Sequence, residues 1–448
     1  MKYASSLSIV AYKVNLLLLF LPKKKMRVLI IGSGGRENAI AWKISKSPLL
    51  EKLFCAPGNP GTSSIAVNLS IDIKSFDAIK SAVLDNSVDM VVVGPEEPLV
   101  NGLGDFFKND ESLKEVNFIG PSSQGAKLEG SKEFAKDFMS KYRIPTAGYK
   151  SFDIDTIEDA ERYIDSLKAP YVLKADGLAA GKGVLIIDDS QQAKRELREI
   201  LTGRFGSAGD KVVIEEFLCG IELSVFVLTD GKNYLILPEA KDYKRAGDGD
   251  KGLNTGGMGA VSPVPFADAN FMSKVESRII IPTIEGLQKE EIDYKGFIFI
   301  GLMNCNGDPY VIEYNVRMGD PETEAVVPRI ESDLLAHFIA LGEGKLEREK
   351  IKISHKCAVT LVMVSGGYPQ NFEKGFEISG ASDLAGEMLF HSGTSMKEGK
   401  LVTFGGRVIA LTALADGIQS GRERLYSLAQ KVTYKGIYYR RDIGLDLL

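Results

Sequence analysis

The stretch KADGLAAGKGV, from Lys174 to Val184, is the part of the chain from which the fold is best inferred. It follows the apolar run APYVL, whose β-branched and aromatic residues are typical of a strand. Glycines let backbone N–H groups approach a ligand closely, and lysines supply point charges. A segment with three glycines, three alanines and two lysines therefore suits a highly charged anion. A surface hairpin tip could have the same composition, and this stretch alone does not distinguish the two.

The stretch differs from the common phosphate-binding motif G-x-x-x-x-G-K-[ST]. Gly177 and Gly181 are one residue too close together, and Gly183 follows Lys182 where the motif has Ser or Thr. The sequence therefore does not predict a Walker A loop here.

The first glycine turn, in RVLIIGSGGREN, is a second candidate anion site. Gly32 and Gly34 fit the start of the dinucleotide fingerprint, but Glu37 occupies the position of its third glycine. The next strand, KLFCAPGN, also lacks the terminal acid that would bind a ribose. The turn can still place backbone N–H groups and a helix N-terminus against a phosphate. We expect an anion site there, with plain strand–helix packing as the alternative.

Length and composition exclude several classes of protein. A chain of 448 residues suggests two to four domains, and 44% hydrophobic with 26% charged residues is ordinary for a globular protein. The net charge of −5 gives no sign of nucleic-acid binding. The four cysteines are scattered without a C-x-x-C pair, which favours reduced thiols in a cytosolic protein. The three histidines have no metal-ligand spacing.

The first 25 residues do not resemble the start of a folded domain. The run VNLLLLFLP is too short to span a membrane, and KKK follows it where a signal peptide has a small-residue cleavage site. Met26 opens MRVLIIGSGGREN, which looks like a natural start. We expect residues 1–25 to be an extension outside the fold or a start codon assigned too far upstream; a basic, hydrophobic membrane anchor is the less favoured alternative.

The pattern of strands and helices changes along the chain. Up to about residue 125, apolar runs such as DMVVVGPEEPLV alternate with helical segments, which predicts a parallel α/β sheet. Further on, YVLKA and GVLII flank the opening stretch as a predicted antiparallel pair. The turns TDGKN and NGD predict two further hairpins. The remainder, from about residue 345, holds short strands such as CAVTLVMVS and RVIALTALA, and no long linker separates the parts.

The segment VIEYNVR carries a set of residues suited to chemistry. Glu313, Asn315 and Arg317 alternate along a predicted strand and therefore share one face. Glu and Asn supply the oxygen ligands that Mg²⁺ prefers, and Arg binds a phosphoryl or carboxylate group through two hydrogen bonds. An exposed strand face of mixed charge is the alternative reading.

Two other segments have features of binding loops. VIEEFLCGIE ends a strand with two acids, and it could offer backbone groups to an adenine and the carboxylate of Glu222 to a ribose. NTGGMGAVSP, from Asn254 to Pro263, is a second glycine-rich loop that follows the polar run KDYKRAGDGDKG. It is either a substrate-binding loop or a flexible excursion, and its length favours a function.

Eight of these motifs, in the same order, resemble the glycinamide ribonucleotide synthetase family, also called phosphoribosylamine–glycine ligases. They are GSGGREN, APGNPGT, GPEEPLV, EGSKEFAKDF, KADGLAAGKGV, GDGDKGLNTGGMGAVSP, VIEYNVRMGDPETE and YYRRDIG, and the resemblance covers residues 26 to 448. It implies an ATP-grasp fold, in which two α+β subdomains clasp ATP. The opening stretch is similar to the lid that closes over the nucleotide.

The resemblance implies a multidomain protein of α/β and α+β class. We expect an N-terminal parallel α/β domain over 26–130 and a central ATP-grasp fold over 131–342, with its lid subdomain at about 145–215. A small mixed β domain should follow over 343–448.

Site residues follow from the same resemblance. Lys132 and Lys174 should reach the ATP phosphates, Arg317 should lie near the transferred phosphoryl group, and Glu313 and Asn315 should bind Mg²⁺ or Mn²⁺. The other expected ATP-binding residues are Gly181, Lys182, Gly183, Glu215, Glu216, Phe217, Leu218 and Glu222. The expected substrate-binding residues are Gly34, Gly35, Arg36, Glu37, Asn59, Pro60, Gly61, Gly94, Pro95, Glu96, Asp242, Lys244, Arg245, Gly256, Gly257, Met258 and Gly259.

The activity implied is the ATP-dependent joining of glycine to 5-phosphoribosylamine through a glycyl phosphate, in purine biosynthesis. The resemblance implies a cytoplasmic enzyme without nucleic-acid, membrane or obligatory protein partners. Asn38 and Tyr243 stand where the family usually has histidine, so a catalytic histidine at either position is in doubt.

Other function classes remain open at this point. Another ATP-grasp enzyme, such as a carboxylase acting on bicarbonate, would share Lys132, Lys174 and Glu313 but not DGDKGLNTGGMG or YYRRDIG. A non-catalytic nucleotide-binding module is disfavoured because both expected metal ligands are present. A dinucleotide oxidoreductase is disfavoured by the incomplete fingerprint at Gly32.

Overall fold

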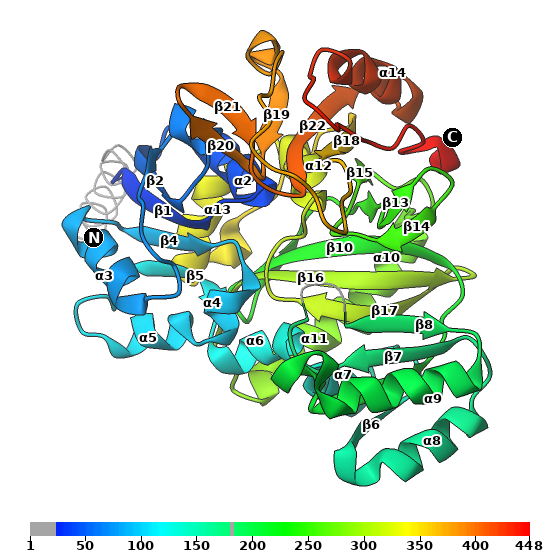
Figure 1. The fold of residues 1–448 in the computed structure, drawn as a ribbon. Helices are drawn as coiled ribbons and strands as arrows, with labels where there is room; N and C mark the ends of the chain where they lie inside the picture. The colour runs from blue at the N-terminus through cyan, green and yellow to red at the C-terminus, as the bar shows by residue number, and fades with distance from the viewer. Residues whose placement is uncertain (1–23, 180–182) are drawn as a thin grey trace, which may run out of the picture.

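A computed structural model describes residues 24–179 and 183–448 (Figure 1). The expectation for residues 1–25 falls almost wholly outside the described residues, as do Gly181 and Lys182. Within the described ranges, no helix is long and apolar enough to cross a membrane.

The N-terminal part forms the predicted parallel sheet. Its strands pair in the order β5-β4-β1-β2-β3. Strand β4 is apolar throughout and β1 is apolar from Val28 onward, because helices or neighbouring layers cover both faces. The strands are β1 (Met26–Gly32), β2 (Leu50–Pro57), β3 (Val67–Asn68), β4 (Met90–Val93) and β5 (Asn117–Pro121). The helices are α2 (Gly35–Ile44), α3 (Phe76–Asp85), α4 (Glu96–Val100), α5 (Leu103–Asn109) and α6 (Ser123–Gly130).

This parallel sheet continues into an antiparallel one. The first residues of β16 pair with β5, at Tyr294 opposite Pro121, so nine strands form one sheet. The Tyr294 side chain is buried at the junction and donates a hydrogen bond of 2.7 Å to the Phe297 carbonyl. The added strands are β10 (Ile221–Thr229), β11 (Tyr234–Ile236), β16 (Tyr294–Cys305) and β17 (Asp308–Asn315). Helices α10 (Ala269–Val275) and α11 (Ile281–Lys289) precede β16, and α13 (Leu334–Gly342) packs on the same sheet.

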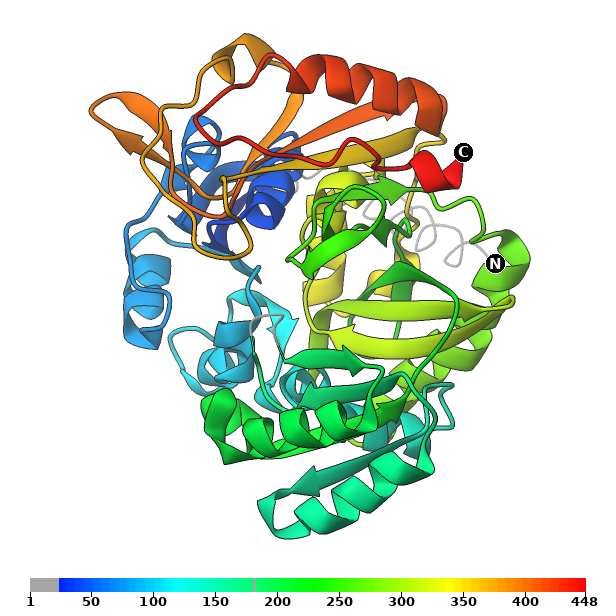
Figure 2. The same cartoon turned by 45° about the vertical axis from the view of Figure 1, so that its right-hand side comes forward.

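A separate four-stranded sheet, in the order β6-β9-β7-β8, lies below these strands in Figures 1 and 2. Strands β7 and β8 pair antiparallel, with Lys174 opposite Val184, as predicted for the segments that flank the opening stretch. The strands are β6 (Tyr149–Asp153), β7 (Tyr171–Ala175), β8 (Val184–Ile187) and β9 (Lys211–Glu216). Helices α8 (Ile157–Ser166) and α9 (Ser190–Glu199) cover one face, and α7 (Lys132–Lys141) leads into this part.

A third, five-stranded sheet, at the top of Figure 2, combines distant segments. Its order is β12-β15-β18-β22-β19, so two strands from the region of the second glycine loop join three from the C-terminal part. They are β12 (Lys241–Asp242), β15 (Gly259–Ser262), β18 (Cys357–Val364), β19 (Met388–His391) and β22 (Arg407–Ala415). Helices α12 (Glu322–Arg329) and α14 (Ile418–Ala429) pack on this sheet. Two hairpins project from it: β13 (Arg245–Gly247) with β14 (Lys251–Asn254), and β20 (Thr394–Lys397) with β21 (Lys400–Thr403).

The end of the chain holds the first of these hairpins in place. Arg440 is buried and donates two hydrogen bonds of 2.8 Å to the two carboxylate oxygens of Asp442. Its third nitrogen donates to Asp250 at 2.9 Å and to the Arg245 carbonyl at 3.1 Å, on the β13–β14 hairpin. The Arg440 guanidinium thus links the C-terminal segment to the β13–β14 hairpin. A planar group with five donors fits this geometry, and an ammonium group would not.

Replacing Arg440 by Met should destabilise the fold by about 2–3 kcal/mol. It removes the Arg440 donor of the Arg245 carbonyl and two of the hydrogen bonds to Asp442, which keeps the one from the Gly249 amide. The value lies below that of a fully buried pair since Asp250 is exposed. Denaturant unfolding measures the loss, and protease sensitivity of residues 245–254 should rise. The exposed neighbour Arg441 provides the matched control, Arg441→Met, which should change neither quantity. Equal effects of the two variants would contradict this role.

Candidate functional site

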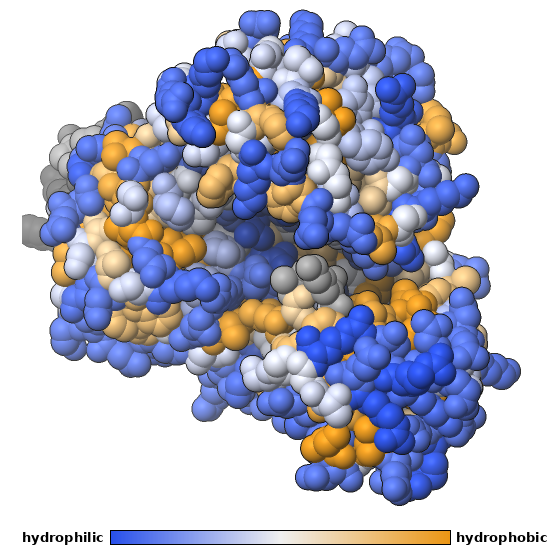
Figure 3. Space-filling view, viewed as in Figure 1, coloured by the Kyte–Doolittle hydropathy of each residue, from blue (hydrophilic) through white to orange (hydrophobic). Residues whose placement is uncertain are grey.

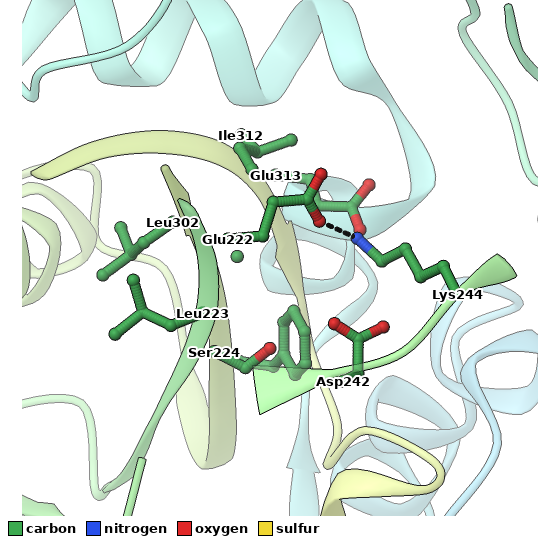
Figure 4. A pocket seen from close by; sticks show the side chains of 10 residues that line it. Glu222, Leu223, Ser224, Asp242, Lys244, Leu302, Ile312 and Glu313 are labelled. Atoms are coloured by element: carbon green, nitrogen blue, oxygen red, sulfur yellow. Dashed lines mark hydrogen bonds and ion pairs between the residues drawn. The ribbon is translucent and has the colours of Figure 1, made fainter. Parts of the chain in front are cut away.

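A cleft separates the upper part of the molecule from the lower four-stranded sheet, and the surface is hollowed there (Figure 3). A small pocket on its wall lies between β10, β12, β16 and β17, with charged groups at its mouth (Figure 4). Glu222 from β10 pairs with Lys244 at 2.5 Å, and Glu313 from β17 points to the same place. The remaining lining residues include Leu223, Ser224, Asp242, Phe299, Gly301, Leu302 and Ile312.

A β-bulge in β17 positions Glu313. Gly301 of β16 lies opposite Glu313, whereas Leu302 lies opposite Val311, so Ile312 is an extra residue on β17. Val311 and Tyr314 therefore both face the core, and Glu313 turns outward with Asn315. Glu313, Asn315 and Arg317 alternate with the buried residues between them, as predicted. Because of the bulge, Glu313 faces the opposite way from Val311, although the two residues are only two positions apart.

The Glu313 carboxylate makes no hydrogen bond or ion pair with any residue that the structure describes, although it lies among cations. Burial opposes its ionisation, but the positive charges of Lys244 and Lys174 outweigh burial and lower the pKa of Glu313. An ionised carboxylate without a partner is a good ligand for a divalent cation. The described residues contain no cluster of three or more His, Cys, Asp or Glu side chains with metal-ligand geometry. A cation here would depend on Glu313, the Asn315 amide oxygen and the bound phosphates.

Lys174 projects from β7 into the interior, not into open solvent. Its ammonium group lies 2.9 Å from a Glu215 carboxylate oxygen and donates to the Ile312 carbonyl at 3.1 Å. The other Glu215 oxygen binds Lys136 of α7 at 2.8 Å. All three side chains are about 4% exposed or less. Two lysines therefore hold Glu215 in place. Its carboxylate is buried between them and is not exposed to a bound adenine.

Sequence reasoning missed Lys136. It lies one helical turn after Lys132, and an i, i+4 lysine pair in EGSKEFAKDF was the available signal. Burial is the main cause that lowers its pKa, to about 8, while Glu215 acts in the opposite direction. Lys136 also donates to Thr146 at 2.8 Å, which ties α7 to the start of the lower sheet.

Lys132 is the first residue of α7, after Ser131, which caps the helix by accepting a hydrogen bond from the Phe134 amide. The Lys132 ammonium group donates to the carbonyls of Asp176 at 3.3 Å and Gly177 at 3.2 Å, at the start of the opening stretch. Burial is the main cause that lowers its pKa. The two lysines expected at the ATP phosphates thus approach the cleft from different elements.

Arg317 lies between two acidic side chains. It donates to Glu129 at 2.7 Å and to the Asn315 amide oxygen at 3.3 Å, and its Nε lies 3.5 Å from Glu96. Glu129, at the end of α6, was not predicted; its other oxygen accepts a hydrogen bond from the Val316 amide at 2.8 Å. Glu129 therefore orients Arg317 toward the cleft.

The first glycine turn is filled by its own glutamate. A Glu37 oxygen accepts from the Gly34 amide at 2.6 Å, and the other binds Arg36 at 2.6 Å. A side chain at Gly94 would overlap the Glu37 carboxylate, which explains a glycine after β4. Arg36 also donates to the Met318 carbonyl at 3.2 Å. Glu37 thus shapes the turn, and Arg36 brings positive charge to the start of α2.

The two positions without the usual histidine have structural roles. Asn38 is buried and accepts a hydrogen bond of 2.7 Å from the His391 backbone amide. Tyr243 is buried, donates to Asp446 at 2.6 Å and accepts from the Gly444 amide at 2.9 Å. Each side chain connects segments far apart in sequence, and neither is free to exchange protons with a substrate.

The C-terminal part contributes residues that sequence reasoning did not include. Arg407 of β22 pairs with Asp320 at 3.1 Å and donates to the Asp320 and Gly256 carbonyls, both at 2.6 Å. Asn59, which was predicted, donates to the His391 carbonyl at 2.7 Å on β19. No local sequence pattern predicted a role for Arg407. Its position beside Asp320 results from the pairing of β22 with β18.

The other predicted residues have these places in the structure, and their roles stay predictions. Glu216 accepts from the Gly148 amide at 3.3 Å, and Phe217 is 41% exposed at the end of β9. Gly183 accepts from the Ala175 amide at 2.8 Å and closes the β7–β8 pair. The expected positions at Leu218, Pro60, Gly61, Pro95, Arg245, Gly257, Met258 and Gly259 lie in loops or strand ends of the elements already described.

Comparison with known proteins gives matches along most of the chain. The sequence models described as Phosphoribosylglycinamide synthetase N domain, ATP-grasp (A) domain and C domain match residues 26–129, 130–323 and 358–446. A phosphoribosylamine–glycine ligase of Caldanaerobacter subterraneus subsp. tengcongensis is 43% identical over 420 residues, covering 94% of this chain and 99% of the relative. The enzyme of the same name from Pseudomonas aeruginosa is 43% identical, covering 94% and 97%.

Solved structures agree. The crystal structure of phosphoribosylamine–glycine ligase from Thermotoga maritima has a TM-score of 0.82 and 37% identity, covering 93% of this chain and all of that one. A biotin carboxylase from Campylobacter jejuni, at 16% identity and a TM-score of 0.68, shares the fold alone. Three family domains in order, and relatives that match over nearly their whole length, lead to one conclusion: this chain belongs to the phosphoribosylglycinamide synthetase family, with its ATP-grasp fold.

Proposed function

We propose that this chain joins glycine to 5-phosphoribosylamine at the expense of ATP, giving glycinamide ribonucleotide, ADP and phosphate. The observation that carries the proposal is the unpaired Glu313 carboxylate, which lies in one cleft with Lys132, Lys174 and Arg317. Family membership supports the choice of substrates. The reaction is a step of purine biosynthesis.

ATP would bind between the lower sheet and strands β10, β16 and β17. Lys174 and Lys132 come from neighbouring elements, the end of β7 and the start of α7, and the exposed Phe217 offers an apolar surface to the adenine. Glu222 is available to the ribose when its ion pair with Lys244 opens. The roles expected of Gly181 and Lys182 stay predictions, because both residues lie outside the described ranges.

The chemistry needs activation because a free carboxylate is a poor electrophile. A carboxylate oxygen of glycine attacks the γ-phosphorus of ATP, the bond to the ADP oxygen breaks, and glycyl phosphate forms. The amine of phosphoribosylamine then attacks the glycyl carbonyl carbon, phosphate leaves, and the nitrogen loses a proton. Lys132, Lys174 and Arg317 would stabilise the negative charge on the transferred group and hold the reactants in line. No side chain is needed as a covalent nucleophile.

The residues present fit a divalent cation. Glu313 supplies an unpaired carboxylate and Asn315 an amide oxygen, and both are hard donors of the kind that Mg²⁺ and Mn²⁺ take. Such an ion would neutralise charge on the ATP phosphates. Both Mg²⁺ and Mn²⁺ are compatible with these two ligands, and both are part of this proposal.

The other end of the cleft suits the phosphate ester of the ribosylamine. The start of α2 carries the positive end of the helix dipole, and its Gly34 and Arg36 amides donate to the carboxylates of Glu37 and Asp320. Arg36 and Arg407 lie beside it. Glycine and the amine would then meet between this end and Arg317. The protein would act on small molecules only, with no nucleic-acid, membrane or obligatory protein partner, and free cysteines at 55, 219, 305 and 357 favour the cytoplasm.

The assay that tests the function measures ADP release with glycine and phosphoribosylamine, separately and together, and identifies the product by mass spectrometry. Product and stoichiometric ADP should require both substrates. Bicarbonate in place of glycine tests the carboxylase alternative and should give no ADP above background. ADP release that depends on bicarbonate would replace the proposed function.

Glu313→Gln should lower kcat at least about 100-fold, because the variant keeps the shape of the side chain but removes the charge that a cation requires. Activity at saturating Mg²⁺ is the measurement, and circular dichroism checks that the fold persists. The matched control is Asp308→Asn at the other end of β17, which is half-exposed and should keep full turnover. Near-normal turnover of Glu313→Gln would exclude Glu313 as a cation ligand.

Lys136→Met should raise the KM for ATP about tenfold, equivalent to about 1.4 kcal/mol. Without Lys136, the charge of Glu215 acts on Lys174 alone and holds it away from the phosphates. Removing that charge as well, in the double variant Lys136→Met/Glu215→Gln, should restore part of the affinity. A double variant weaker than either single one would show that Lys136 acts only through stability.

A further inference from the structure

Glu324, in the first turn of α12, is a buried carboxyl group without a hydrogen-bond partner. Its exposed fraction is zero, and neither of its two oxygens has a partner among the residues that the structure describes. The contrast with Glu129 is clear, because both Glu129 oxygens accept hydrogen bonds. A buried polar group without partners costs free energy and calls for an explanation.

The Glu324 carboxyl group lies where three parts of the molecule meet. A side chain at Gly35, the first residue of α2, would overlap a Glu324 oxygen and would lie 2.7 Å from the Ser392 hydroxyl. Gly35 belongs to the N-terminal part, Ser392 follows β19, and α12 packs against α2, β15, β18 and β22. Glu324 therefore lies directly against the start of α2.

The charges around Glu324 come from three elements. Arg36 lies on α2, Arg407 on β22, and Asp320 in the loop before α12. Burial raises the pKa of Glu324 well above its usual value, Asp320 adds to this, and the two arginines act in the opposite direction without reversing it.

The other packed elements add little charge. Strand β15 has no titratable side chain, and β18 has only the Cys357 thiol. His391 on β19 is uncharged at neutral pH because burial lowers its pKa to about 4.

The net charge next to the start of α2 depends on whether Glu324 is ionised. Arg36 is paired with Glu37, and Arg407 with Asp320, so the four groups sum to zero. An ionised Glu324 would add one uncompensated negative charge directly against the start of α2, where the proposed function places a phosphate. A neutral Glu324 leaves that end of the helix free to attract an anion.

We propose that Glu324 works as a neutral carboxylic acid, a positioning residue that supports Gly35 and Ser392 without placing negative charge against the anion-binding start of α2. The role in substrate affinity rests on the proposed function. The neutral state itself does not, because it follows from burial and from the absence of partners.

Infrared spectroscopy tests the neutral state directly, on the protein without substrates. The difference spectrum between wild type and Glu324→Gln at pH 7 should contain the C=O stretch of a protonated carboxylic acid. The exposed Glu398, in the β20–β21 turn, gives the control: Glu398→Gln should show no such band. A carboxylate band in its place would overturn the proposal, whatever the enzyme's activity.

Stability gives a second readout with a defined sign. A carboxyl group whose pKa is higher in the folded state loses stability as pH rises above its unfolded pKa, and a glutamine does not. The folding equilibrium constant of Glu324→Gln, divided by that of wild type, should therefore rise up to tenfold per pH unit from pH 5 upward. A ratio independent of pH would contradict a protonated Glu324. Glu324→Met, also uncharged, gives the same comparison if Glu324→Gln does not fold.

The positioning role predicts a separate kinetic effect. As pH rises far enough to ionise Glu324, the wild-type KM for phosphoribosylamine should increase, with the KM for ATP unchanged, and Glu324→Gln should lack this increase. Identical pH profiles of the two proteins would overturn the role in affinity. Failure of the wild-type protein to form product under any condition would instead refute the proposed function and leave the infrared result standing.

Discussion

The pairing of Glu215 with two lysines is the interaction on which the cleft depends. Lys136 and Lys174 come from different elements, and a single carboxylate joins them in a region that solvent hardly reaches. Two buried ammonium groups without a counter-charge would be costly, and one lysine would leave no net charge for a phosphate. Two lysines and one glutamate leave a net positive charge, fixed in place and facing the cleft.

The same principle governs the rest of the site. Arg317 lies against Glu129 and Glu96, Arg36 against Glu37, and Arg407 against Asp320. Glu313 and Asp242 differ, because each carboxylate has cations nearby but no hydrogen-bonded or ion-paired partner within the described residues. Burial raises the pKa of Asp242, whereas the nearby lysines lower the pKa of Glu313. Glu313 is therefore the better cation ligand of the two.

The cleft is held together by contacts between segments far apart in sequence. Asn38 and Asn59 bind the backbone of His391, Tyr243 binds Asp446, and Arg440 binds the β13–β14 hairpin. The N-terminal and C-terminal parts therefore form one side of the cleft together. The C-terminal sheet also includes strands β12 and β15 from the centre of the chain, which joins this side of the cleft to the central part.

Much of the fold and part of the site follow from sequence alone. The apolar runs predicted the parallel strands, the segments around Lys174 predicted the β7–β8 pair, and eight ordered motifs identified the family. These features are local, since strand and turn signals depend on neighbouring residues, and motifs keep their order along the chain. Glu313 could be singled out because its segment alternates in a regular way.

The tertiary structure alone decided which charges pair. Glu129, Arg407 and Glu324 carry no local signal, and Lys136 carries only the i, i+4 lysine pair, because the residues that they contact lie between about 80 and 290 residues away. The bulge at Ile312 also escaped prediction, since it depends on the register between two strands. A buried charge is tolerated only when a partner, or protonation, compensates for it, and the partner's position is a property of the folded chain.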